Sequence, residues 1–203
     1  WTGDDPVVLN ITQHDATPHG RDVWVNWGFW EQATEGLPAV FAGPNSELIG
    51  GLGTLSLDDM KALLRSSRAY LTTGTQPASY TLGLIEAMMT GIPVVSIAPS
   101  FMRIFPYGSQ LYEGLEITRL GPLGEGSDQG AIDVARWELE NLLGQTENWN
   151  HWASTFNKDK AAQDGWERAR SISKWQRERA IELFGKDTIA DQWAQYLGVK
   201  VLA

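Results

Sequence analysis

Cysteine is absent from the 203 residues of this chain. Its absence excludes disulfide bonds, thiolate nucleophiles and zinc sites built on cysteine. A sequence without cysteine also fits a reducing compartment, so we expect a cytoplasmic protein.

Basic residues and long apolar runs are also scarce. There are 16 Lys and Arg against 25 Asp and Glu, which gives a formal net charge of -9. Nonspecific binding to nucleic-acid backbones or anionic lipid needs a basic surface, so neither partner is expected. No apolar run approaches the roughly 18 residues of a membrane-spanning helix. Any phosphate group must therefore be held by a local site.

The length and composition are typical of a globular domain, with 42% hydrophobic and 20% charged residues. The sequence starts at Trp1, with neither an initiator Met nor a signal-peptide pattern, and we interpret it as a piece of a longer protein. We expect residues 1–203 to form a single domain with a C-terminal helical tail.

Apolar segments of strand length alternate with helical patterns along the first half of the chain. The expected strands are Pro6–Thr12, Leu37–Ala42, Ala69–Thr73 and Pro93–Ile97, and the expected helices are Asp22–Thr34, Leu57–Ser67 and Tyr80–Thr90. This alternation predicts an α/β fold, a parallel sheet with helices on both faces. Ligands of such sheets bind beyond the carboxyl ends of the strands, where we expect the loops 13–21, 43–55, 74–80 and 98–108.

The second half has a weaker strand signal and clearer helices. A short strand is possible at Leu115–Thr118. Helices are expected at Ala131–Leu143, Gly165–Phe184 and Thr188–Leu197, because apolar residues recur there at helical spacing. The last two would form the tail, at about residues 165–197.

Two segments leave alternatives open. Trp24, Trp27 and Trp30 recur every three residues along one side of the first expected helix. This spacing favours packing in the core or between domains, with sugar stacking or contact with a missing partner domain as the alternative. Gly50, Gly51 and Gly53 form a glycine-rich loop without the Lys-Ser/Thr of a phosphate-binding loop. We interpret that loop as flexible, with a phosphate cradle as the alternative, and expect Ser56 after it to cap a helix.

The stretch Ser79–Ile97, SYTLGLIEAMMTGIPVVSI, carries the most information. Ser79 suits a helix N-cap, and Gly91 followed by Pro93 suits the helix end. One acidic residue, Glu86, lies within the largely apolar helix. Its carboxylate would accept hydrogen bonds from paired hydroxyls such as those of a ribose, although an ordinary solvated position is the alternative.

An anionic ligand is expected where this helix begins. The helix follows a strand, so its free N–H groups and partial positive charge face the ligand edge of the sheet. The loops expected at that edge also carry a few basic residues, namely His14, His19, Arg21 and Arg103.

The segment YTLGLIEAMMTGIPVV resembles the donor-site segment of retaining, nucleotide-sugar-dependent glycosyltransferases of GT-B architecture, in particular those like glycosyltransferase family 4. In that family the segment reads approximately Glu-Gly-Phe-Gly-Leu, three residues, Glu-Ala-Met-Ala, one residue, Gly, one residue, Pro-Val-Val. The resemblance covers roughly residues 7–197, all in the C-terminal, donor-binding half. It implies a Rossmann-like domain that is one half of a GT-B fold.

The resemblance also implies roles for single residues. Glu86 matches the second Glu of the family's paired-Glu motif, which implies hydrogen bonds to the nucleotide ribose. The first Glu of the pair, which contacts the donor sugar in the family, falls on Ala78. Backbone N–H groups of Thr81 and Leu82 would meet the donor diphosphate, and Ser79 and Tyr80 would approach the sugar. The positions nearest to the family's diphosphate-binding Arg and Lys are occupied by His14 and Arg21.

The implied activity is transfer of a sugar from a nucleoside diphosphate sugar to an acceptor hydroxyl, with retention. The donor would be a substrate, and neither a cofactor nor a metal is expected. An N-terminal acceptor domain or a partner subunit would complete the enzyme. A non-catalytic nucleotide- or sugar-binding module, or a degenerate transferase domain, is the alternative, and a sugar-nucleotide epimerase is a third possibility.

Overall fold

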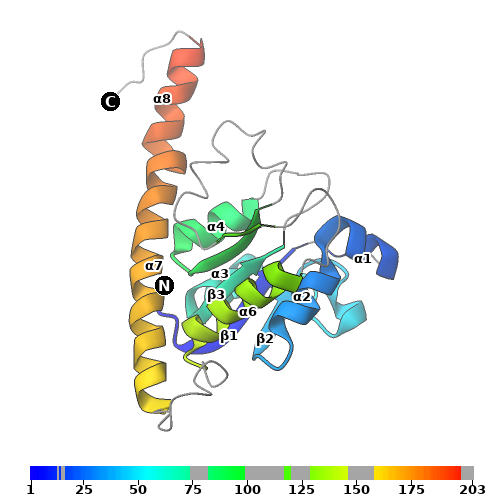
Figure 1. Cartoon of the computed structure of the whole chain (residues 1–203). Coiled ribbons are helices and arrows are strands. Elements are labelled where there is room, and N and C mark those ends of the chain that lie inside the picture. Colours follow the sequence, from blue (N-terminus) through cyan, green and yellow to red (C-terminus); the bar gives the residue numbers. More distant parts are fainter. Residues whose placement is uncertain are drawn as a thin grey trace.

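A computed structural model describes residues 1–12, 14, 17–73, 82–98, 117–119, 129–145 and 158–197. Its centre is a five-stranded sheet in the order β2-β1-β3-β4-β5, in which every neighbouring pair is parallel (Figure 1). The strands are β1 (Asp5–Ile11), β2 (Ala39–Ala42), β3 (Ser67–Thr72), β4 (Val94–Ala98) and β5 (Ile117–Arg119). The predicted α/β fold with a parallel sheet is confirmed.

Helices cover both faces of the sheet. Helices α2 (Trp27–Thr34) and α6 (Gln129–Leu143) share one apolar core with alternate strand residues such as Val8 and Leu71. Helices α3 (Leu57–Ser66) and α4 (Leu82–Thr90) share the other core, with the intervening strand residues such as Leu9 and Tyr70. Successive side chains of a strand point to opposite faces, which explains why these strands are apolar throughout.

The long helix α7 (Lys158–Phe184) packs against both α4 and α6, and Figure 1 shows α8 (Lys186–Leu197) extending beyond it at one side of the molecule. The Gln176 side chain binds the first residue of β4, because the Val94 N–H donates to its Oε1 at 2.8 Å and its Nε2 donates to the Val94 carbonyl at 3.1 Å. Helix α7 starts earlier than expected. Its first residues are polar and show no apolar periodicity, so the sequence pattern did not predict this part of the helix. The helical tail is confirmed, and it is longer than predicted.

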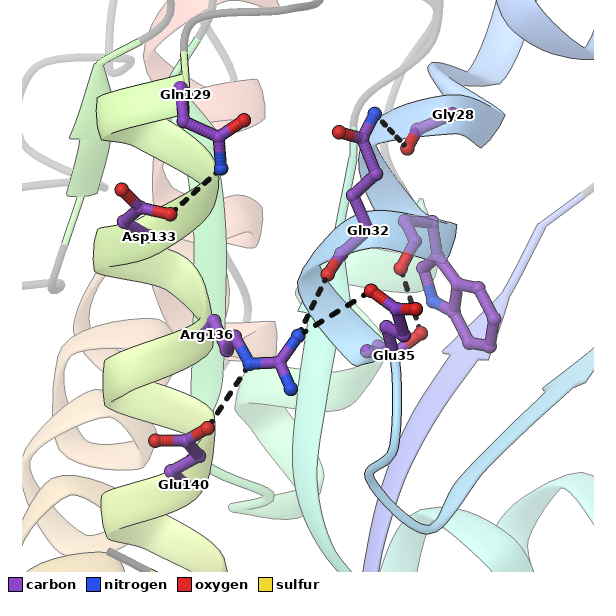
Figure 2. A network of polar contacts seen from close by, with 9 residues as sticks. Gly28, Gln32, Glu35, Gln129, Asp133, Arg136 and Glu140 are labelled. Carbon is purple, nitrogen blue, oxygen red and sulfur yellow. Dashed lines mark hydrogen bonds and ion pairs between the residues drawn. The ribbon is translucent and has the colours of Figure 1, made fainter. Parts of the chain in front are cut away.

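Arg136 on α6 connects that helix to the end of α2 (Figure 2). Its Nη1 lies 3.5 Å from the carbonyl oxygen of Gln32 and 4.0 Å from a carboxylate oxygen of Glu35, and its Nε donates to Glu140 at 3.1 Å. A cation beside the last carbonyls of a helix complements the helix dipole. The pair with Glu35 is exposed, so it adds little to stability.

The prediction of a single helix over Asp22–Thr34 is wrong. The chain forms α1 (Pro18–Val25) and α2, separated by Asn26 in a left-handed conformation with φ of 50°. Asn26 Nδ2 donates to the Thr73 carbonyl at 2.8 Å, and the Thr73 hydroxyl donates to the Val25 carbonyl at 2.6 Å. Asn tolerates this conformation better than most residues, and the two bonds fasten the break to the end of β3.

The tryptophan stripe packs in the core where the structure describes it. Trp27 and Trp30 stack with ring centroids 5.1 Å apart, and both contact the Phe41 ring edge-on. Trp30 is buried and Trp27 is half-buried. These contacts support the packing interpretation for these two residues, whereas the Trp24 side chain lies outside the described part of the chain.

The expected helix ends are confirmed at two positions. The Ser56 hydroxyl accepts a hydrogen bond from the Asp59 N–H at 3.2 Å and so caps α3. Gly91, with φ of 95°, follows α4, and its N–H donates to the Ala87 and Met88 carbonyls.

Among the described residues, no helix combines the length and apolarity that crossing a membrane requires.

Gly165 allows α7 to cross closely over the end of α6. A Cβ atom at this position would lie 2.5 Å from the Asn141 carbonyl oxygen and 2.8 Å from the Gly144 nitrogen. Both are backbone atoms, so a methyl group would force the two helices apart. We predict that Gly165→Ala lowers the free energy of unfolding by about 1 to 3 kcal/mol, although Ala favours helix by about 1 kcal/mol in the absence of a clash.

Urea denaturation checks this prediction. Ser171→Ala is the matched control, because Ser171 is exposed on the same helix. A Gly165→Ala protein as stable as the Ser171→Ala protein would show that the close crossing is not maintained in solution.

Candidate functional site

The strand order identifies where a ligand would bind. The chain passes from β1 to β2 on one side, and β3 then lies on the other side of β1. The reversal lies between β1 and β3, and open α/β sheets of this strand order bind ligands in the crevice at the carboxyl ends of such a pair. The candidate site is therefore the end of these two strands.

Strands β1 and β3 pair as far as Leu9 and Tyr70, and beyond this point side chains connect them. The Tyr70 hydroxyl donates to the Ile11 carbonyl at 2.9 Å and accepts from the Ile11 N–H at 3.2 Å. Asn10 Nδ2 donates to the Leu71 carbonyl at 2.7 Å. We call the contact of Tyr70 with Ile11 and the contact of Asn10 with Leu71 the two side-chain bridges.

Helix α4 begins beside the Tyr70 bridge. A Cβ atom on Gly83 would lie 3.4 Å from the Ile11 carbonyl oxygen and 3.5 Å from the Tyr70 hydroxyl oxygen, which is ordinary contact distance. The first turn of α4 thus lies against the ends of β1 and β3. Its N-terminal partial positive charge favours an anion at this crevice.

Glu86 belongs to the same region. It is exposed, and it follows Gly83 by three residues, so both lie on one side of α4. Burial raises the pKa of Tyr70 to about 12, the hydrogen bond with the Ile11 backbone opposes this shift, and the negative charge of Glu86 adds to it. Glu86 is therefore close enough to the bridge to act on it electrostatically, and its exposed carboxylate is accessible to a ligand.

His14 lies just after β1, but its side chain is buried. It is 1% exposed, packs edge-on to Trp27 with centroids 5.3 Å apart, and lies 5.6 Å from the Phe41 ring. Its carbonyl accepts from Asn45 Nδ2 at 2.8 Å. The structure thus shows a packed imidazole, and contact of His14 with a diphosphate stays a prediction.

The other predicted site residues are described in part or not at all. Ser79, Tyr80 and Thr81, together with Ala78 and Arg103, lie outside the described residues. Leu82 is the first residue of α4 and Arg21 belongs to α1, but the side chains of both lie outside the description. Their roles stay predictions.

The glycine-rich loop is bonded to itself and to the edge of the sheet. Gly50 and Gly51 donate to carbonyls of the short helix η1 (Ser46–Ile49), Leu52 donates to the Phe41 carbonyl, and Gly53 donates to the Ser46 hydroxyl. Since these N–H groups are engaged, this geometry argues against a phosphate cradle. The loop instead covers the outer edge of β2, which would otherwise be open to pairing.

Sequence reasoning missed the two bridging side chains. Asn10 interrupts an apolar strand and Tyr70 lies in another, and a buried polar group requires a partner, so this was the available signal. It shows that a partner exists but does not identify it. Within the described ranges, no group of three or more His, Asp or Glu side chains could hold a metal ion.

We predict an alkaline stability loss that depends on Tyr70. An unfolded tyrosine ionises near pH 10, whereas folding raises the pKa of Tyr70 to about 12. The folded state thus retains its proton longer, and the free energy of unfolding falls as the pH rises from 10 to 12, by up to about 2 to 3 kcal/mol. The contribution is fully present below pH 10.

Urea denaturation of the native protein and Tyr70→Phe at pH 9, 10 and 11 checks this. The stability advantage of the native protein over Tyr70→Phe should shrink as the pH rises, while other titrating groups cancel in the difference. An advantage that stays constant over this range would contradict the raised pKa.

No protein-family model matches the sequence, and no match is found among curated proteins. Solved structures do match. The pneumococcal O-GlcNAc transferase GtfA, in complex with UDP and GlcNAc, is 15% identical with a TM-score of 0.54, over 97% of this chain and 36% of that protein. Anabaena Alr3699/HepE, in complex with UDP and glucose, is 17% identical with a TM-score of 0.58, over 96% of this chain and 48% of that protein. TarM is 14% identical with a TM-score of 0.53, over 96% of this chain and 35% of that protein.

These similarities show the fold. The chain has the α/β, Rossmann-like fold found within GT-B glycosyltransferases. It spans between about a third and a half of the length of the structures it matches.

Proposed function

We propose that this chain is the donor-binding half of a glycosyltransferase that transfers a sugar from a nucleoside diphosphate sugar to an acceptor hydroxyl, with retention. An N-terminal acceptor domain or a partner subunit would supply the acceptor site. One observation carries the proposal: α4 begins against the ends of β1 and β3, and it carries the exposed Glu86, whose charge acts on Tyr70 at this point.

The chemistry of this position suits a nucleotide sugar. The start of α4 offers N–H groups and partial positive charge to a diphosphate, and Glu86 offers two acceptor oxygens to a ribose diol. In two of the matching structures, a protein of this fold was solved with UDP and a sugar, GlcNAc in one and glucose in the other. These complexes support UDP as the first nucleotide to test.

The proposed residues would act by binding and by electrostatics. The bond between the anomeric carbon and the diphosphate oxygen would break while a bond to the acceptor oxygen forms on the same face of the sugar. The diphosphate would leave with the bonding electrons, and its departing oxygen would take the proton of the acceptor hydroxyl. The start of α4 would stabilise the negative charge that develops on the diphosphate. Glu86 would hold the ribose and so position the reacting bond.

A non-catalytic nucleotide- or sugar-binding module is the second candidate. Two observations favour it: Ala78 stands where the resembling family has a sugar-contacting Glu, and the imidazole of His14 is buried against aromatic rings. Such a module would bind the same ligands without transferring the sugar. Transfer to an acceptor, tested together with the acceptor half, distinguishes the two candidates.

We predict that Glu86→Gln weakens nucleotide-sugar binding about tenfold or more. The change removes the charge from a hydrogen bond worth about 1.5 to 3 kcal/mol, while the side chain keeps its size. Isothermal titration calorimetry with UDP-GlcNAc, UDP-glucose and further nucleoside diphosphate sugars measures the effect. Glu178→Gln is the matched control, because Glu178 is exposed on α7 and the charge change is the same.

Equal affinity of Glu86→Gln and the native protein would remove Glu86 from the site. Equal weakening by Glu178→Gln would point to the net charge of the protein rather than to a contact. If no nucleoside diphosphate sugar binds the native protein, the proposed function is wrong.

A further inference from the structure

We propose that Tyr70 is a positioning residue for the donor site, whose hydroxyl holds the end of β1 against the first turn of α4 and so determines where Glu86 stands. The inference rests on the proposed function. It assigns a role to a residue that does not itself touch the donor.

The Tyr70 hydroxyl is engaged within the protein. The side chain is 2% exposed, and its oxygen both donates to and accepts from the backbone of Ile11, at 2.9 and 3.2 Å. A ligand in the crevice would therefore meet a hydroxyl already bonded on both sides. Tyr70 thus acts on the site through the groups that it holds.

Gly83 is the residue of α4 that lies against this bridge. Gly83 has no side chain, and its Cα faces the Ile11 carbonyl and the Tyr70 hydroxyl. A Cβ atom at this position would already be in van der Waals contact with both oxygens. Glu86 lies three residues further on the same side of the helix, and its charge acts on Tyr70. Loss of the hydroxyl would release the Ile11 N–H and carbonyl from β3, while pairing with β2 would still hold β1 on its other side.

The Tyr70 bridge compensates for strand pairing that stops early. The ladder between β1 and β3 runs to Leu9 and Tyr70, and Ile11 would otherwise present an unpaired N–H and carbonyl toward the crevice. Ile11 is partly buried, and an unpaired backbone group away from water is costly, so both hydrogen bonds to the hydroxyl favour this arrangement. Tyr70 thereby pairs Ile11 beyond the end of the ladder, where Asn10 pairs Leu71, and its hydroxyl lies against the first turn of α4.

Amide hydrogen exchange tests the bridge without any donor. In the native protein, the Ile11 N–H donates to the Tyr70 hydroxyl, so Tyr70→Phe should raise its exchange rate about tenfold or more in ¹⁵N-resolved NMR spectra. Thr34→Val is the matched control, because it removes another buried hydroxyl bonded to a backbone carbonyl, that of Trp30 at 2.7 Å. Unchanged Ile11 exchange in Tyr70→Phe overturns the proposal.

Donor titration then tests positioning through Glu86. Calorimetry with the UDP-sugar that binds best should show Tyr70→Phe weakening binding about three- to tenfold in the native background and less than twofold in Glu86→Gln. A purely structural role would reduce affinity by the same factor in both backgrounds, and this result overturns the proposal. Thr34→Val should bind as the native protein does, and a loss equal to that of Tyr70→Phe also overturns it.

A second variant keeps the test decisive if Tyr70→Phe does not fold. Gly83→Val retains Tyr70 but adds carbon atoms at the contact with the bridge, so it should displace the first turn of α4 and weaken binding about threefold or more. Unchanged affinity would overturn the proposal. If no donor binds the native protein, the proposed function fails, and the Ile11 exchange rate still reports whether the Tyr70 bridge forms.

Discussion

The early end of pairing between β1 and β3 is the constraint on which the site depends. After Leu9 and Tyr70 the two strands are joined by side chains, and each contact satisfies backbone groups that the ladder no longer pairs. These strand ends lie where the strand order reverses, so the groups that surround them come from segments far apart in sequence.

Neighbouring elements are fastened to the same two strand ends. The break between α1 and α2 is bonded to Thr73 just after β3, and the first turn of α4 packs on Ile11 at the end of β1. At the opposite end of the sheet, Gln176 of α7 pairs with the start of β4. Contacts therefore hold the sheet at the carboxyl ends of β1 and β3 and at the amino end of β4.

The sequence was sufficient to predict the sheet, its parallel strands and the helix that carries Glu86, because apolar periodicity and the Gly91–Pro93 stop are local signals. The break at Asn26 was missed because it depends on a hydrogen bond to Thr73, which is distant in sequence. Burial of His14 follows from the convergence of Trp27 and Phe41, which no local pattern encodes. Proximity of Tyr70 to α4 is likewise a property of the packed fold.

NMR mapping can test whether a nucleoside diphosphate binds at the carboxyl ends of β1 and β3. In a titration of ¹⁵N-labelled protein with UDP, we expect the amide signals of Thr73, Gly83 and Glu86 to shift together and to saturate with one dissociation constant. Shifts confined to residues remote from these strand ends, for example on α7, or no saturable shift at all, would contradict it.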